Sequence, residues 1–123
     1  MNLQDIGLTQ NQQTILHRFI ATCQRDERVA AAFLGGSFAK ASNDAYSDLD
    51  LYVIITDEGY DGFFAARENI IRALGEPLFL EVFRDYGFDL LLFIFADGTE
   101  GELGLGRASN FTHIHGGPNQ LLN

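Results

Sequence analysis

The 123-residue sequence has a single cysteine, Cys23, two prolines and no tryptophan. One cysteine excludes a disulfide framework within the chain, and this is typical of proteins of a reducing cytoplasm. Because Cys23 lies within a helical pattern, we expect a buried and chemically inert thiol. The scarcity of proline, beside thirteen glycines, indicates many turns rather than a proline-rich linker. A chain of this length forms one domain around one hydrophobic core.

Basic residues are scarce as well: 8 Lys and Arg stand against 17 Asp and Glu, and the formal net charge is −9. Nucleic-acid binding normally relies on Lys and Arg to displace counterions, so we expect no nucleic-acid partner. A small cation or a cationic small molecule suits such a surface better, although solubility alone also accounts for the charge.

Long hydrophobic runs are missing. None of the apolar runs is long enough to span a bilayer. The first residues, MNLQD, lack the basic start and the apolar stretch of a signal peptide. The sequence therefore predicts no membrane association and a cytoplasmic location.

Hydrophobic patterning predicts helices at residues 9–25 and 60–74, the first with Thr9 and Gln12 as a capping box and the second ending at Gly75. Residues 48–55 are the strongest strand signal, because they are rich in β-branched and aromatic side chains. The order of elements predicts an α/β (α+β) fold: a mixed β-sheet with helices mainly on one side. The remaining expected elements are a helical turn at 37–43, strands at 29–34, 78–83, 88–95 and 102–105, and a last short segment at 111–115.

Gly36 and Ser37 follow an apolar strand and open a helical turn. Glycine lets the backbone approach a ligand, and the start of a helix offers free N–H groups, so the pair is a candidate phosphate cradle. Taken alone the signal is weak, because glycine and serine after a strand usually form an ordinary turn. Lys40 is a candidate to add positive charge to the phosphates, or it is a surface lysine.

Asp48 and Asp50 begin the strongest strand, where alternation puts both carboxylates on one face while Leu49 and Leu51 enter the core. Two acids so close repel each other, and a divalent cation is the obvious compensation. A solvated strand end with two harmless acids is the alternative.

Glu102 lies on a later strand, after the expected hairpin turn at Asp97 and Gly98. Alternation with Leu103 turns its side chain away from the core. A neighbouring strand would bring it beside the two aspartates, where it would complete a metal site; otherwise it is an exposed hairpin acid. Asp89 and Glu100 fit the alternation less well, and the phenylalanines of residues 79–95 are expected in the core.

Residues 34–54, LGGSFAKASNDAYSDLDLYVI, resemble the signature of the DNA polymerase beta-like nucleotidyltransferase superfamily. In that pattern Gly-Ser is followed about ten residues later by Asp-x-Asp on an apolar strand, as Gly36, Ser37, Asp48 and Asp50 are. The joint match is far more specific than either half. The segment from Asp97 to Leu105 resembles the family's third carboxylate strand, so this role passes to Glu102.

The resemblance implies a nucleotidyltransferase fold and transfer of a nucleoside monophosphate from a nucleoside triphosphate to a hydroxyl. Asp48, Asp50 and Glu102 would be the catalytic residues and the ligands of Mg²⁺ at a two-metal site. Gly36 and Ser37, with Lys40, would bind the nucleotide. Two residues depart from the family pattern: Ala41 replaces a common glycine, and the third acid is Glu rather than Asp.

Within the superfamily, the sequence is most similar to bacterial antibiotic nucleotidyltransferases of the lincosamide and aminoglycoside branches. The expected acceptor is therefore a small molecule, with antibiotics as candidates. A protein partner, as in toxin–antitoxin pairs, and nucleotide binding without turnover are the alternatives. We expect residues 1–123 to form one nucleotidyltransferase domain. It is either the N-terminal part of a longer protein or a minimal protein that completes itself as a homodimer.

Overall fold

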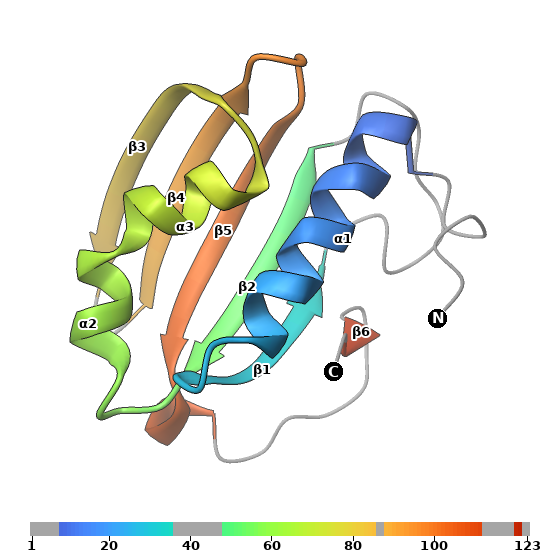
Figure 1. Cartoon of the computed structure of the whole chain (residues 1–123). Coiled ribbons are helices and arrows are strands. Elements are labelled where there is room, and N and C mark those ends of the chain that lie inside the picture. The colour runs from blue at the N-terminus through green and yellow to red at the C-terminus, as the bar shows by residue number, and fades with distance from the viewer. Residues whose placement is uncertain (1–7, 36–47, 86–87, 112–119, 122–123) are drawn as a thin grey trace.

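The computed structural model describes residues 8–35, 48–85, 88–111 and 120–121. Within these residues the chain forms three α-helices and six strands around one sheet (Figure 1). In chain order they are α1 (Gln10–Gln24), β1 (Val29–Leu34), β2 (Leu49–Ile55), α2 (Tyr60–Ala65), α3 (Arg67–Leu74), β3 (Pro77–Asp85), β4 (Phe88–Phe95), β5 (Glu100–Arg107), a short 3₁₀ helix (Ala108–Asn110) and β6 (Gln120–Leu121).

The six strands form one mixed sheet in the order β3-β4-β5-β2-β1-β6. The central pair, β2 and β5, is parallel, and every other neighbouring pair is antiparallel. Strands β2 and β5 are far apart in the sequence, and helices α2 and α3 lie in the connection between them. The predicted mixed sheet is confirmed.

All three helices cover the same face of the sheet (Figure 1). Strand β2 shows how the core is built, because Leu49, Leu51 and Val53 are buried in one cluster with residues of the three helices. The alternate residues Asp50 and Tyr52 point to the opposite face, as period-two alternation requires. That opposite face carries no α-helix in the described part of the chain, and we call it the open face.

Helix α1 begins as its sequence predicts. The Thr9 side chain accepts a hydrogen bond from the Gln12 backbone N–H, and the Gln12 side chain accepts one from the Thr9 backbone N–H. This capping box satisfies two N–H groups that the helix itself leaves free. Cys23 is buried on the inner side of α1, and burial raises the pKa of its thiol to about 12. An inert thiol is therefore confirmed.

The single helix predicted for residues 60–74 is wrong, because α2 ends at Ala65 and α3 starts anew at Arg67. Between them the Arg67 guanidinium donates a hydrogen bond to the carbonyl oxygen of Phe64. Two short helices keep Phe63 and Ile71 both buried against the sheet. The expected turn at 37–43 and most of the segment 111–115 lie outside the described residues.

Two further differences concern strand ends and burial. Strands β3 and β5 are longer than expected, and the predicted turn between β4 and β5 contains Gly98 at a φ of 91°, which favours glycine. Not all of the phenylalanines in 79–95 are in the core: Phe93 and Phe95 are buried, but Phe79 and Phe83 are exposed. Both exposed rings lie on β3, which is an edge strand with a neighbour on one side only. No helix of the described residues is long and apolar enough to cross a membrane.

Candidate active site

Strands β2 and β5 bring two of the three predicted catalytic acids side by side. Asp50 and Glu102 are direct partners in the parallel ladder, so both side chains lie on the open face. Both are half-buried, whereas Asp48, which immediately precedes β2, is exposed. The end of β1 reaches the same place, because the Gly35 N–H donates to the Asp50 carbonyl oxygen at 2.9 Å.

The three carboxylates have no compensating cation among the described residues. Burial, and then the charge of Asp48, raise the pKa of Asp50. Burial, and then the charges of Asp50 and Asp48, raise the pKa of Glu102. Among the described residues, none of the three forms an ion pair. Acids held together without a cation are unfavourable in their ionised form.

The donor chemistry of these acids fits Mg²⁺, which prefers carboxylate oxygens shared with substrate phosphates. The side chains do not yet converge, because no three His, Cys, Asp or Glu side chains in the described residues meet where a metal ion would bind. Asp50 and Glu102 share a rung of the ladder, so their side chains start side by side on the same face of the sheet. The backbone therefore holds the acids side by side and leaves the final arrangement of their oxygens open.

A pocket of about 240 Å³ opens beside the acids. One wall is apolar and comes from β3 and β4, and the other is acidic and comes from β5 and the start of β2. Its lining residues include Phe79, Leu92, Ile94, Asp48, Glu100 and Glu102. The apolar wall and the acids thus form one continuous site on the open face.

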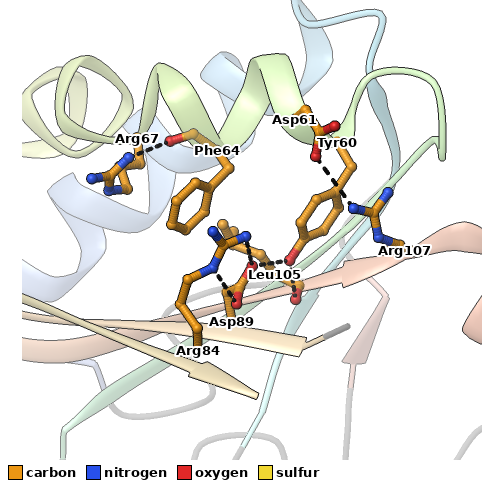
Figure 2. Close-up of polar contacts among 8 residues, drawn as sticks. All are labelled: Tyr60, Asp61, Phe64, Arg67, Arg84, Asp89, Leu105 and Arg107. Atoms are coloured by element: carbon orange, nitrogen blue, oxygen red, sulfur yellow. Dashed lines mark hydrogen bonds and ion pairs between the residues drawn. The ribbon is translucent and has the colours of Figure 1, made fainter. Parts of the chain in front are cut away.

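Asp89 lies on the other face of the sheet. Figure 2 shows Tyr60 reaching from α2 to Asp89, with Arg84 of β3 against the same carboxylate. Tyr60 donates to Asp89 at 2.7 Å and also lies 3.1 Å from the Leu105 carbonyl oxygen, while Arg84 donates at 3.1 and 3.2 Å. Burial alone would raise the pKa of Asp89, but the hydrogen bonds from Arg84 and Tyr60 hold it below its usual value. Asp89 is therefore an internal structural acid.

The residues predicted to bind the nucleotide, Gly36, Ser37 and Lys40, lie outside the described residues, as does Ala41. Their roles stay predictions. The described chain ends next to them on both sides, at Gly35 and at Asp48, and both of these residues are at the acidic end of β2.

Tyr52 is a residue of this site that the sequence analysis did not single out. It follows Asp50 by two residues on the open face, and burial, then the charges of Asp50 and Glu102, raise the pKa of its hydroxyl. Tyr52 is the third residue of the alternation that contains Asp48 and Asp50. Because tyrosine is common in strands, this pattern alone does not indicate a functional residue.

The family model described as streptomycin adenylyltransferase matches residues 9–104, a span that includes Asp48, Asp50 and Glu102. The chain belongs to this family. A search of curated proteins found no match. The predicted membership of the polymerase beta-like nucleotidyltransferases is confirmed, and with it the fold class.

Solved structures share the fold of this adenylyltransferase-family domain. An aminoglycoside 6-adenyltransferase from Bacillus subtilis matches with a TM-score of 0.62 and 17% identity, over 84% of this chain and 38% of that one. A cytoplasmic RNA terminal U-transferase matches with a TM-score of 0.59 and 15% identity, over 84% and 33%. A variant of the poly(U) polymerase Cid1 bound to MgATP matches with a TM-score of 0.55 and 13% identity, over 80% and 33%. The present chain thus spans well under half the length of each.

Proposed function

We propose that this chain is the nucleotidyltransferase domain of an enzyme that transfers a nucleoside monophosphate from a nucleoside triphosphate to a hydroxyl of a small molecule, with antibiotics as the first candidates. The observation that carries the proposal is the pairing of Asp50 with Glu102 across the parallel strands, beside Asp48. Burial and then the charge of Asp48 raise the pKa of Asp50, and burial and then the charges of Asp50 and Asp48 raise the pKa of Glu102. None of the three acids forms an ion pair among the described residues. A site of this kind needs a cation that comes with a ligand.

In this proposal Asp48, Asp50 and Glu102 hold Mg²⁺ at a two-metal site. Bound Mg²⁺ neutralises the phosphate charge and lowers the pKa of the attacking hydroxyl. Between them the carboxylates orient the triphosphate and the acceptor hydroxyl. The solved relative with bound MgATP supports the choice of metal and nucleotide.

Gly36 and Ser37 would donate hydrogen bonds to the phosphates, and Lys40 would add a positive charge. These roles rest on the family signature, and they suit the position of Gly35 beside Asp50. We place residues 1–123 in one domain of a longer cytoplasmic protein, because relatives with the same fold are more than twice this length and a single cysteine suits a reducing compartment.

The pocket indicates the class of acceptor. Its acids Glu100 and Glu102 favour a cationic group, and its apolar wall at Leu92 and Ile94 favours contact with a hydrocarbon skeleton. A net charge of −9 opposes a polynucleotide acceptor, because phosphates are repelled by such a surface. Two of the relatives are nevertheless an RNA terminal U-transferase and a poly(U) polymerase, so RNA belongs in the test.

A protein acceptor is the second candidate, and one observation favours it. The edge strand β3 exposes Leu78, Phe79 and Phe83 beside a row of backbone groups that pair with no other strand in the part of the chain that the structure describes. Such edges accept an added strand from another chain. Nucleotide binding without turnover is a third reading, which Ala41 and the longer acid at position 102 support.

The test is an acceptor screen that measures pyrophosphate release with each nucleoside triphosphate and Mg²⁺. The panel holds aminoglycosides, lincosamides, an RNA oligonucleotide and purified candidate proteins. We expect release with a small molecule, loss of release in Asp50→Ala, and full release in Glu58→Gln, an exposed acid that follows β2 at the end of the strand opposite to Asp50. Release with RNA alone would contradict the small-molecule acceptor, and triphosphate binding without release for any acceptor would favour the module without turnover.

A further inference from the structure

Tyr52 is held in place beside the candidate metal ligands. Its partner in the parallel ladder is Gly104, and Glu102 lies two residues before that glycine on the same face of β5. Neighbouring strands lie about 4.8 Å apart and residues two apart on one strand share a face, so an aromatic side chain at position 52 that leans across β5 comes near Glu102. The backbone thus sets the Tyr52 side chain next to Glu102.

Gly104 provides the space that the Tyr52 ring uses. A Cβ atom at position 104 would lie 2.8 Å from Tyr52 Cδ1 and 2.7 Å from Phe88 Cζ, closer than such atoms approach in proteins. The two rings meet over this glycine, with their centroids 6.3 Å apart and their planes at 35°. The Tyr52 ring therefore rests across β5, and packing limits the positions that its hydroxyl reaches.

The Tyr52 hydroxyl differs from the Tyr60 hydroxyl, which is buried on the helix-covered face. Tyr60 uses its hydroxyl fully, with Asp89 and the Leu105 carbonyl oxygen as partners. No hydrogen bond joins the Tyr52 hydroxyl to the described residues. Asp50 and Glu102 form no ion pair among the described residues, so a half-buried donor beside them is placed to serve one of the two carboxylates.

We propose that Tyr52 is a positioning residue for Glu102: its hydroxyl donates a hydrogen bond to the Glu102 carboxylate when that carboxylate turns to hold a divalent cation. This inference rests on the proposed function. Carboxylates that bind metals are normally oriented by a hydrogen-bond donor outside the metal's own ligands. A glutamate has one more rotatable bond than an aspartate and loses more rotamer freedom when it is held, so the third acid of this chain gains most from such a donor.

The experiment measures Mn²⁺ affinity of the full chain by calorimetry, with and without ATP, in the wild type, Tyr52→Phe and Tyr60→Phe. Tyr52→Phe keeps the ring and its packing and removes only the hydroxyl. We expect Mn²⁺ to bind about tenfold more weakly to Tyr52→Phe, in the range found for such outer donors. The matched control, Tyr60→Phe, removes a phenol hydroxyl on the other face and leaves Mn²⁺ affinity unchanged.

A double-mutant cycle shows whether Tyr52 acts through Glu102. In a Glu102→Ala background, Tyr52→Phe should weaken Mn²⁺ binding no further, because its partner is already gone. Unchanged affinity in Tyr52→Phe, or an equal loss in both backgrounds, would overturn the role of Tyr52 and leave the metal site intact. A wild type that binds no Mn²⁺ with or without ATP would overturn the proposed function and this inference together.

Discussion

Acids on the two faces of the sheet have pKa values that are shifted in opposite directions. On the helix-covered face, Asp89 is only 3% exposed, yet its pKa is lowered because Arg84 and Tyr60 donate hydrogen bonds to it. On the open face, Asp50 and Glu102 are better exposed, yet their pKa values are raised, first by partial burial and then by the charges of neighbouring acids, Asp48 for Asp50 and both aspartates for Glu102. The more deeply buried acid is thus the better stabilised.

This contrast separates a structural acid from a candidate ligand-binding acid. A buried charge is retained in a fold when the fold supplies its partner, as Arg84 does for Asp89. Acids that the backbone brings together without such a partner make the unliganded fold less stable, and they gain free energy when a cation binds. Position on the sheet, rather than burial alone, therefore identifies the site.

The largest effect on stability is expected from Asp89→Ala. The substitution removes the carboxylate that holds Arg84 and Tyr60 together, and breaking such a buried pair costs about 3 kcal/mol in the free energy of unfolding. Chemical denaturation at pH 7 measures it. Glu81→Ala, an exposed acid on the neighbouring strand, is the control and should change stability by less than about 0.5 kcal/mol. Equal small effects for both variants would contradict the structural role of Asp89.

The effect of Mg²⁺ on the free energy of unfolding should depend on pH. Because the folded pKa values of Asp50 and Glu102 lie above their usual values of 3.8 and 4.5, their ionisation destabilises the metal-free fold as pH rises through the unfolded and then the folded pKa. Mg²⁺ at a hundred times its dissociation constant should restore about 2.7 kcal/mol at pH 7. Near pH 4 a larger fraction of these two acids is protonated than at pH 7, and the gain should shrink.

Thermal unfolding with Mg²⁺ and with EDTA, at both pH values, provides this measurement. The Asp50→Asn variant is the control and should lose most of the Mg²⁺ effect at pH 7. A Mg²⁺ effect of equal size at pH 4 and pH 7 would show that the ion acts elsewhere on the chain.

Tyr60→Phe should have a smaller effect on stability, about 1 kcal/mol, because it removes one hydrogen bond while Arg84 still holds Asp89. Its ring stays packed in the core, so the loss reports the hydroxyl alone. Denaturation of this variant in the Asp89→Ala background checks the coupling, and the second substitution should then cost less. Additive losses would show that Tyr60 and Asp89 act independently.

The smallest expected change is a gain in stability rather than a loss. Asp50→Asn removes one of the repelling charges of the open face, so the metal-free protein should gain up to about 1 kcal/mol at pH 7 while it loses function, as is common at binding sites. Denaturation in EDTA measures the gain. A loss of stability of the same size would mean that Asp50 makes a favourable contact in the metal-free fold.

The sequence predicted those parts of the molecule that depend on local pattern. The capping box at Thr9 gave the start of α1, and alternation in residues 48–55 placed Asp50 opposite Leu49 and Leu51. The break at Ala66 was missed because it depends on how Phe63 and Ile71 reach the sheet together, which no short window contains.

The site was predictable to the extent that its motif is contiguous. One short segment is enough to assign Asp48 and Asp50 to the site, whereas the pairing of Asp50 with Glu102 depends on β2 and β5 meeting in the sheet. The roles of Tyr52 and Asp89 could not be predicted for the same reason. Tyr52 gains its surroundings from Gly104 and Phe88 on other strands. The structural role of Asp89 depends on Arg84 of the neighbouring strand and on Tyr60, which is 29 residues away in the sequence.

The central claim is that the acids of the open face bind a metal-bound nucleotide, and titration calorimetry tests it most directly. Each nucleoside triphosphate is titrated into the protein with Mg²⁺ and with EDTA, in the wild type, Asp50→Ala and Asp89→Asn. The account predicts binding that requires Mg²⁺, disappears in Asp50→Ala and persists in folded Asp89→Asn. Nucleotide binding that survives in Asp50→Ala, or no binding of any triphosphate to the folded wild type, would contradict it.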